Sequence, residues 1–142
     1  MMKSKFYIDN KKQYDYFFKK GDIVFVDLGK PDKPSEQGGI RPCVIVQNNV
    51  GNKYSPTTIV APISSQIKYN KNGNIQPTHF IIENYKEAGL KSRSMILCEQ
   101  IRAISKKRIL DTSPKGHINF NDFKGRILTA FGIDNSEEKI NA

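Results

Sequence analysis

Gly21-Asp-Ile-Val-Phe-Val-Asp27 and Pro42-Cys-Val-Ile-Val-Gln47 are apolar runs of strand length, and together they decide the fold. Their β-branched residues are typical of buried strands. Between them, Gly29-Lys-Pro-Asp-Lys-Pro34 cannot continue a hydrogen-bonded ladder, because proline has no amide hydrogen. We therefore predict strands at Asp22 to Asp27 and at Pro42 to Gln47, joined by a long polar loop.

More strand-length runs alternate with turn-forming segments along the rest of the chain. They predict strands at Thr57 to Ile63 and His79 to Ile82, and one long strand from Ser94 to Ile104. Two segments rich in asparagine and glycine, residues 48–52 and 70–74, are expected to be surface loops. Short strands separated in this way favour a mainly β fold that closes into a small barrel.

A helix is expected after the last strand. Asn121, or alternatively Asn119, is suited to cap it, and it is predicted to run to about Phe131. Ser105 is suited to cap a shorter helix from Lys106 to Leu110. The apolar residues of the last helix repeat at helical spacing and should face the barrel; they are Phe123, Ile127, Leu128 and Phe131.

With 142 residues, the chain is long enough for one domain. We divide it into a basic N-terminal extension at residues 1–20, a domain at residues 21–133, and a flexible polar tail at residues 134–142. The extension carries six lysines. Its aromatic residues suit one face of a short amphipathic helix, with Tyr14, Phe17 and Phe18 at the required spacing.

The formal charge of +9 and the isoelectric point of about 9.6 favour polyanionic partners, because lysine and arginine displace the counterions of nucleic-acid phosphates. On charge alone, a purely solubilising role is an equally good interpretation. No apolar run approaches the roughly 20 residues that span a bilayer. Met1 to Asn10 lacks the apolar core of a secretory signal. We expect a cytoplasmic protein that does not bind a membrane.

Cysteine and histidine usage argues against a metal site. Cys43 and Cys98 each lie in an apolar run, so we expect buried free thiols. His79 and His117 are far apart in the sequence and belong to no metal-ligand motif. We therefore expect no metal ion and no other cofactor.

The segment Ser35-Glu-Gln-Gly-Gly-Ile-Arg-Pro42 is the most informative for function. Its paired glycines let a loop approach a ligand closely, and the proline after Arg41 restrains that residue to an extended backbone. A guanidinium fixed in this way suits the two non-bridging oxygens of a phosphate. An ordinary loop pair between Arg41 and Glu36 is the alternative, and composition alone favours it.

This segment and several others resemble the MazF/PemK family of toxins in order and in spacing. The resemblance spans roughly Gly21 to Ile133 and is far more specific than any single short motif. The matching segments are Gly21 to Val24, Glu36 to Pro42, Val44 to Asn48, Ser55 to Ala61, Pro77 to His79 and Leu97 to Arg102.

The resemblance implies a fold, an activity and partners. The fold is a partly open SH3-like barrel of the MazF/PemK/CcdB type, with a C-terminal helix and short helical segments. The activity is that of a type II toxin, a metal-independent and sequence-specific endoribonuclease that cleaves single-stranded RNA such as mRNA. The partners are a second copy of the chain, in a homodimer, and a cognate MazE-like antitoxin whose acidic tail occupies the RNA groove.

The resemblance also implies catalysis by an arginine at Arg41 and a hydroxyl residue at Ser64, which makes catalysis the preferred role of Arg41. In such cleavage the ribose 2′-hydroxyl attacks the adjacent phosphorus and expels the 5′-oxygen. Arg41 would stabilise the phosphorane, while Ser64 would bond the phosphate or pass a proton. The family usually has threonine at this position. Ser65 offers a second hydroxyl on the opposite face of a strand, so which serine faces the phosphate stays open.

The remaining candidates would contact RNA. Glu36 is assigned an ordering role in its loop in preference to a role as base. His79 changes charge near neutral pH, yet a locally hydrogen-bonded strand histidine is the favoured interpretation. Gln100 and Arg102 share a face if Ile101 points into the core, with a solvated sheet face as the alternative. The full set of RNA-binding candidates is Ser35, Glu36, Gln37, Gly38, Gly39, Ser65, Gln66, His79, Gln100 and Arg102.

Besides the serine at position 64, two features depart from the family pattern. The hairpin from Lys68 to Gln76 is longer and more polar than is typical, and the N-terminal extension is basic; either would affect the preferred target sequence.

Two other functions compete with the endoribonuclease. A gyrase-poisoning toxin of the CcdB type is one competing function, but such toxins lack the pairing of Arg41-Pro42 with Ser64. A non-catalytic RNA-binding module that uses the basic surface is the other.

Overall fold

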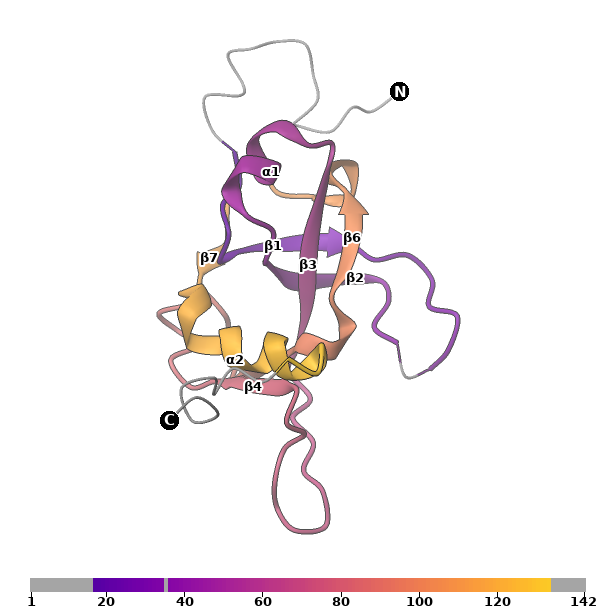
Figure 1. Cartoon of the computed structure of the whole chain (residues 1–142), viewed down its shortest axis with the longest axis vertical. Helices are drawn as coiled ribbons and strands as arrows, with labels where there is room; N and C mark the ends of the chain where they lie inside the picture. Colours follow the sequence, from indigo (N-terminus) through magenta and orange to yellow (C-terminus); the bar gives the residue numbers. More distant parts are fainter. Residues whose placement is uncertain (1–16, 35, 134–142) are drawn as a thin grey trace.

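The structure is a computed structural model that describes residues 17–34 and 36–133. The described chain folds into seven short strands and a few helical segments (Figure 1). The strands are β1 (Asp22–Asp27), β2 (Ile40–Ile45), β3 (Thr57–Ser64), β4 (His79–Ile82), β5 (Ser94–Leu97), β6 (Arg102–Ser105) and β7 (Gly116–His117). The helices are α1 (Asn49–Tyr54), α2 (Phe120–Ala130) and the 3-10 helices η2 (Cys98–Gln100) and η3 (Lys106–Arg108).

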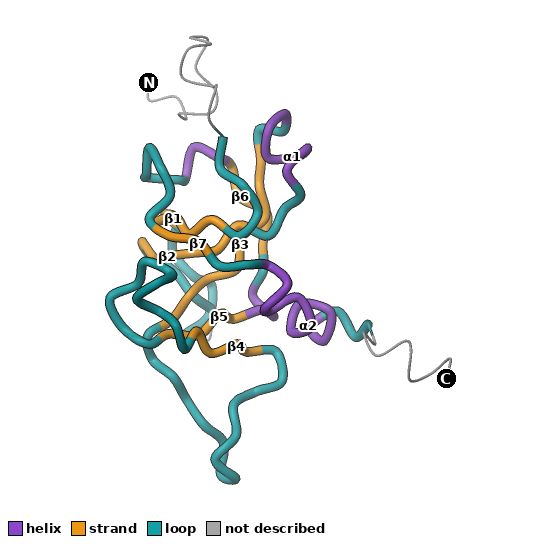
Figure 2. The backbone as a smooth tube through the Cα atoms, turned by 90° about the vertical axis from the view of Figure 1, so that its left-hand side faces the viewer, coloured by secondary structure: helices purple, strands orange, loops and turns teal. Residues whose placement is uncertain are grey.

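The strands form one antiparallel sheet in the order β4-β5-β3-β2-β1-β7, with β6 also paired to β3. β3 is the central strand, because β2 lies along one of its edges while β6 and β5 lie along the other. Val60 of β3, for example, pairs with Ile45 of β2 and with Arg102 of β6. The sheet curls around its core, with α2 beside β4 and β5 (Figure 2). The prediction of a mainly β, partly open barrel with a C-terminal helix is confirmed.

Two hydrophobic clusters fill the space around the sheet. Alternate residues of β1 enter different clusters: Ile23 belongs to the first, and Val24 and Val26 belong to the second. β1 and its partner β2 thus carry buried residues on both faces, which is why their buried parts read as continuous apolar runs. The first cluster also contains Val44, Ala61, Ile63, Ile82, Ala88, Ile96, Cys98, Ile118, Phe123 and Ile127; the second also contains Phe18, Leu28, Cys43, Ile45, Val60, Ile104 and Ile109.

The predicted long strand from Ser94 to Ile104 is wrong in its middle. It is two strands, β5 and β6, which pair with different parts of β3 and are separated by η2. The amide of Cys98 leaves the ladder and donates to the carbonyl oxygen of Thr78. The interruption turns Glu99 and Gln100 out of the alternating pattern of a strand, and the site depends on this change of direction.

Segment 48–52 is also not the predicted loop. Asn48 caps α1, with its side chain accepting from the amide of Gly51 at 2.8 Å. The side chain of Asn52 is buried and accepts from the hydroxyl of Thr58 at 2.7 Å, which fixes the short helix to β3. β2 begins at Ile40, before the predicted start at Pro42, and ends at Ile45.

The C-terminal helix is confirmed with a changed boundary. Asn119, the alternative cap, accepts from the amide of Asn121 at 3.0 Å. Phe123 and Ile127 face the core as predicted, and Leu128 is half-buried. Phe131 is 61% exposed, because it lies beyond the last helical turn as the C-terminal cap. η3 is capped by Ser105 as predicted and covers only residues 106–108.

The ends of the chain leave several predictions without a test. Tyr14, in the expected N-terminal helix, lies outside the described residues, as does the tail at 134–142. Phe17 and Phe18 are not helical, and Phe18 is buried in the second cluster. The boundaries of the three segments remain predictions. No helix in the described ranges is long and apolar enough to cross a bilayer.

Candidate active site

Arg41 lies on β2, opposite Val26 of β1. Its side chain is held by its own loop, because Nε donates to the carbonyl oxygen of Gly38 at 2.9 Å. With Nε occupied in this way, the two terminal guanidinium nitrogens can bind a ligand. The proposed pairing of Arg41 with Glu36 is not what orders either residue. Glu36 Oε1 accepts from the amides of Asp32 at 2.9 Å and Lys33 at 3.3 Å, which agrees with the ordering role assigned to it.

The two glycines before Arg41 fold the loop tightly onto the start of β2. The amide of Gly39 donates to the carbonyl oxygen of Gly29 at 2.8 Å, and its φ of 72° lies in the left-handed region. Gly38 has no room for a side chain, because a Cβ there would lie 2.3 Å from Cδ of Pro31. The glycine pair therefore serves the loop that carries Arg41.

Ser64 is the last residue of β3 and is 6% exposed. Its Oγ accepts from the amide of Gln66 at 3.1 Å, so the hydroxyl hydrogen is free to donate elsewhere. β2 and β3 pair Cys43 with Pro62, and this register continued by two residues sets Arg41 across from Ser64. Both side chains then belong to the same face of the sheet.

The cavities and the strand register differ over which serine lies with Arg41. Arg41 and Ser65 border a cavity of about 480 Å³, whereas Ser64 borders another of about 470 Å³. Ser65 is exposed and lies just past the end of β3. In the strand register, Arg41 lies on the same face of β2 as Cys43, two residues further on, and across from Ser64.

The cavity at Ser64 collects polar residues from four segments of the chain. The backbone amide of Gln37 donates to Oε1 of Gln100 at 2.9 Å, which ties the glycine-rich loop to η2. The side-chain oxygen of Gln37 is buried with no hydrogen-bond partner among the described residues. The lining residues are Glu36, Gln37, Ser64, Gln66, Lys68, Gln76, His79, Met95, Leu97, Glu99 and Gln100.

His79 is 7% exposed and lies at the start of β4. Its Nε2 lies 3.0 Å from Oε2 of Glu99, and Oε1 of the same carboxylate accepts from the hydroxyl of Thr78 at 3.1 Å. The favoured interpretation of a locally hydrogen-bonded histidine agrees with this geometry. Nδ1 is buried and finds no partner in the described part of the chain.

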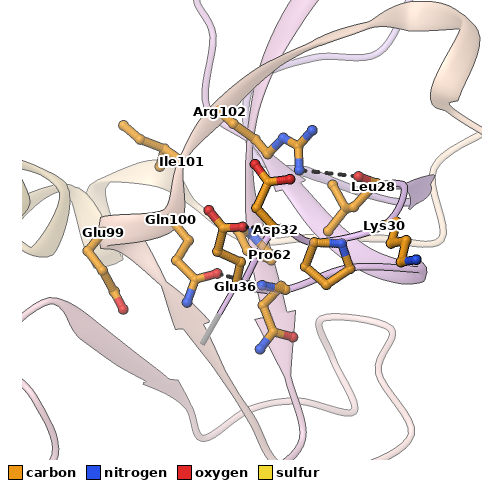
Figure 3. Close-up of a pocket in the computed structure, with 11 residues that line it drawn as sticks. Leu28, Lys30, Asp32, Glu36, Pro62, Glu99, Gln100, Ile101 and Arg102 are labelled. Atoms are coloured by element: carbon orange, nitrogen blue, oxygen red, sulfur yellow. Dashed lines mark hydrogen bonds between the residues drawn. The ribbon is translucent and has the colours of Figure 1, made fainter. Parts of the chain in front are cut away.

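A further cavity, of about 410 Å³, lies next to the cavity at Ser64. The two cavities share Glu36, Gln37, Glu99 and Gln100. We call the two joined cavities the groove. Arg102 lines the cavity of about 410 Å³ and donates from Nη1 to the carbonyl oxygen of Leu28 at 3.2 Å (Figure 3). Gln100 and Arg102 thus line one surface, as expected, although the cause is η2 and not strand alternation.

Residues 19–125 match the family described as PemK-like, MazF-like toxin of type II toxin-antitoxin system. The chain belongs to this family. It is 48% identical over 93 residues to endoribonuclease EndoA of Bacillus subtilis (strain 168), an alignment that covers 66% of this chain and 75% of the relative.

Solved structures share the fold of the toxin. MazF from Deinococcus radiodurans has a TM-score of 0.63 at 18% identity, with 84% of this chain and 100% of that chain covered. An endoribonuclease in complex with its cognate antitoxin, from a mycobacterial species, has a TM-score of 0.59 at 18% identity, with 82% and 94% covered.

The structure of the toxin brings most of the sequence candidates together. Gln37, Gln66, His79 and Gln100 line the groove, and Arg102 lies at its far end. Ser35 lies outside the described residues. Gly38 and Gly39 shape the loop.

Sequence reasoning missed Lys68, Gln76 and Glu99 as groove residues of the toxin. Lys68 and Gln76 flank a hairpin that departs from the family pattern, and that departure was the available signal. Within residues 17–34 and 36–133, no group of three or more His, Cys, Asp or Glu side chains is placed to hold a metal ion. The expectation of metal-free chemistry stays a prediction.

Proposed function

We propose that this toxin is a metal-independent endoribonuclease that cleaves single-stranded RNA, including mRNA, at short sequences. Membership of the toxin family and 48% identity to an endoribonuclease support the class of activity. The observation that carries the proposal is the register of β2 and β3, which, continued by two residues past the pair Cys43–Pro62, sets Arg41 across from Ser64, and Ser64 lines the polar groove. A phosphate at this place would meet a fixed cation and a free hydroxyl donor.

The chemistry requires no nucleophile from the protein. The ribose 2′-oxygen forms a bond to phosphorus, the bond from phosphorus to the 5′-oxygen breaks, and a proton passes from the first oxygen to the solvent or a base while the second gains one. Arg41 stabilises the extra negative charge of the phosphorane through its terminal nitrogens. Ser64 donates its hydroxyl hydrogen to a phosphate oxygen. That hydrogen is available because Ser64 Oγ acts only as the acceptor in its bond with the amide of Gln66. DNA lacks the 2′-hydroxyl and is not cleaved.

The pair of His79 and Glu99 shapes the groove in this proposal. Two contacts fix the carboxylate of Glu99: the hydroxyl of Thr78 donates to Oε1 at 3.1 Å, and Nε2 of His79 lies 3.0 Å from Oε2. A carboxylate held in this way restricts where a phosphate can lie and leaves the bases of the RNA to contact the polar wall. Gln37, Gln100 and Arg102 supply donors and acceptors for that contact.

The toxin acts in the cytoplasm as a homodimer held inactive by a MazE-like antitoxin. The net charge of +9 favours an acidic antitoxin tail that competes with RNA. A related fold has been solved with its cognate antitoxin bound. Exposed apolar side chains support a second copy as partner, since Phe25 and Ile40 are 37% and 62% exposed and border one cavity.

The test is incubation of purified, antitoxin-free toxin with a long single-stranded RNA and with DNA of the same sequence, in the presence of EDTA. We expect discrete cuts in the RNA and intact DNA. RNA that binds but stays uncut would support a non-catalytic RNA-binding module, while gyrase inhibition without RNA cleavage would support the CcdB-type function.

A further inference from the structure

Residues 65–78 form a long loop, here called the arm, that joins β3 to β4 and extends beyond the sheet (Figures 1 and 2). The arm begins directly after Ser64 and ends directly before His79, and both of these residues line the groove. The arm contains Lys68 and Lys71 and no acidic residue. Lys68 lines the groove, and Lys71 is exposed near the tip.

The tip of the arm has its own hydrogen bonds. The side-chain oxygen of Asn70 accepts from the amides of Asn72 at 2.9 Å and Asn74 at 3.0 Å. The backbone amide of Asn70 donates to the carbonyl oxygen of Asn74 at 2.8 Å, and Gly73 adopts a φ of 79° that closes the turn. The tip is therefore a defined turn that presents Lys71.

The first limb of the arm is fixed to the sheet by Arg93. Its Nε and Nη2 each donate to one carboxylate oxygen of Glu83 at 2.8 Å, and its Nη1 donates to the hydroxyl of Tyr69 at 3.3 Å. Glu83 follows β4 directly and Arg93 precedes β5 directly, so the paired strands orient the guanidinium. Tyr69 alone of these three belongs to the arm.

The second limb is attached separately. The carbonyl oxygen of Pro77 accepts from Nη1 of Arg126 on α2 at 3.1 Å, and the hydroxyl of Thr78 bonds to Glu99. Because both limbs are tied to the body of the protein, the arm projects in one direction from the mouth of the groove.

We propose that the arm is an extension of the RNA site, in which Lys68 and Lys71 bind phosphates of nucleotides outside the scissile step and Arg93 positions the arm through Tyr69. This inference rests on the proposed endoribonuclease function. An RNA strand that leaves the groove beside Ser64 meets Lys68 first and Lys71 further along. With no carboxylate in the arm to neutralise them, both ammonium groups attract the backbone whatever its sequence.

The test compares two single-stranded RNAs that contain the same mapped cut site, one with little flanking sequence and one with long flanks. For Lys68→Ala/Lys71→Ala we expect KM to rise about tenfold more on the long RNA than on the short one, since an exposed charge pair contributes roughly threefold. The loss should fall on KM and not on kcat. The salt dependence of binding to the long RNA should weaken by about 0.7 in log–log slope for each lysine.

The matched control is Lys53→Ala, which removes one exposed positive charge from α1, at the opposite end of the molecule from the arm (Figure 1). We expect it to keep the wild-type ratio of KM values for the two RNAs. An equal change on both RNAs in the double arm variant, or no change, would overturn the inference. If the wild-type toxin cuts neither RNA, the proposed function itself fails.

The positioning role is tested with Tyr69→Phe, which removes the hydroxyl bonded to Arg93 and leaves every charge in place. We expect KM for the long RNA to rise about twofold, with kcat maintained. Arg93→Ala should produce a larger rise of the same kind, and Arg93→Lys a partial recovery. Wild-type KM ratios in Tyr69→Phe and Arg93→Ala, with circular dichroism unchanged, would show that the arm needs no such anchor.

Discussion

Arg41 Nε donates a hydrogen bond of 2.9 Å to the carbonyl oxygen of Gly38, three residues earlier in the chain. The bond turns a flexible side chain into one of fixed direction and leaves the two terminal nitrogens for a phosphate. Preorganised donors of this kind are worth most where charge develops during a reaction. The arginine and the glycine-rich loop are therefore one functional unit.

Arg41→Ala is expected to lower kcat for RNA cleavage by about 10² to 10³, the usual effect of removing one donor from a transition state. The free energy of unfolding should fall by only about 1 kcal/mol, for one lost hydrogen bond. Single-turnover cleavage and urea unfolding measure the two quantities.

The control for Arg41 is Arg108→Ala. Arg108 is an exposed arginine, and like Arg41 it donates from its guanidinium to a backbone carbonyl, that of Asp27 at 3.1 Å. Arg108 lines neither the groove nor the cavity that Arg41 borders, and Arg108→Ala should keep wild-type cleavage. A loss of less than tenfold in Arg41→Ala would contradict the role assigned to Arg41.

Gly38→Ala is expected to reduce cleavage without touching a charged group. The added Cβ would lie 2.3 Å from Cδ of Pro31 and 2.9 Å from the carbonyl oxygen of Gly29, so the loop must shift and move the acceptor of Arg41. We expect kcat to fall about tenfold, because small displacements of positioning groups cost rate steeply. A variant that cleaves at the wild-type rate would show that the loop does not set the direction of the guanidinium.

Replacement of the two serines decides which hydroxyl acts. Ser64→Ala should lower kcat more than Ser65→Ala, because strand register places Ser64 on the face of Arg41. Ser64→Thr keeps the hydroxyl and should retain most of the activity. Rates measured on one oligonucleotide under single-turnover conditions give the order; a larger loss in Ser65→Ala would transfer the role to that residue.

Local sequence patterns were sufficient for the strands and insufficient for the breaks between them. β1 and β4 have the predicted bounds, since each is an apolar run ended by turn-forming residues. The sequence predicts a strand through Cys98 to Gln100, the residues of η2, because they continue the alternation. Its true conformation depends on tertiary bonds to Thr78 and Gln37, and no local pattern contains those.

The same distinction holds for the site. The segment before Pro42 identified Arg41 and the two glycines, because their roles are local to one loop. Lys68 lines the groove next to Tyr69, whose hydroxyl accepts from Arg93, 24 residues away in sequence. A contact of that range cannot be inferred from spacing in a single chain.

Lys106 gives a prediction for stability at alkaline pH. It is buried, its ammonium donates to the carbonyl oxygen of Asn52, and burial lowers its pKa from 10.5 to about 8. Between pH 8 and pH 10.5 the unfolded chain still holds the proton, whereas the folded chain has lost it. The free energy of unfolding therefore rises with pH in this window. Urea unfolding should show that wild type gains stability relative to Lys106→Met from pH 8 to pH 9. A constant difference would mean that the amine does not titrate in this range.

Cys43 and Cys98 should have the opposite effect at higher pH. Both thiols are buried and free, as the sequence predicted, and burial raises the pKa of each from 9.0 to about 12. Above pH 9 the unfolded chain loses these protons while the folded chain keeps them, so the free energy of unfolding falls as pH rises from 9 toward 12.

The measurement is alkylation by iodoacetamide together with unfolding at several alkaline pH values. At pH 8 the native thiols should stay unmodified and should react only after denaturation, because the thiolate is the nucleophile. Cys43→Ala/Cys98→Ala should lose part of the alkaline decline. Rapid alkylation of the native protein would mean that a thiol is exposed or ionised, and Cys43 would be the first to examine, because Arg102 and Arg41 act to lower its pKa against the effect of burial.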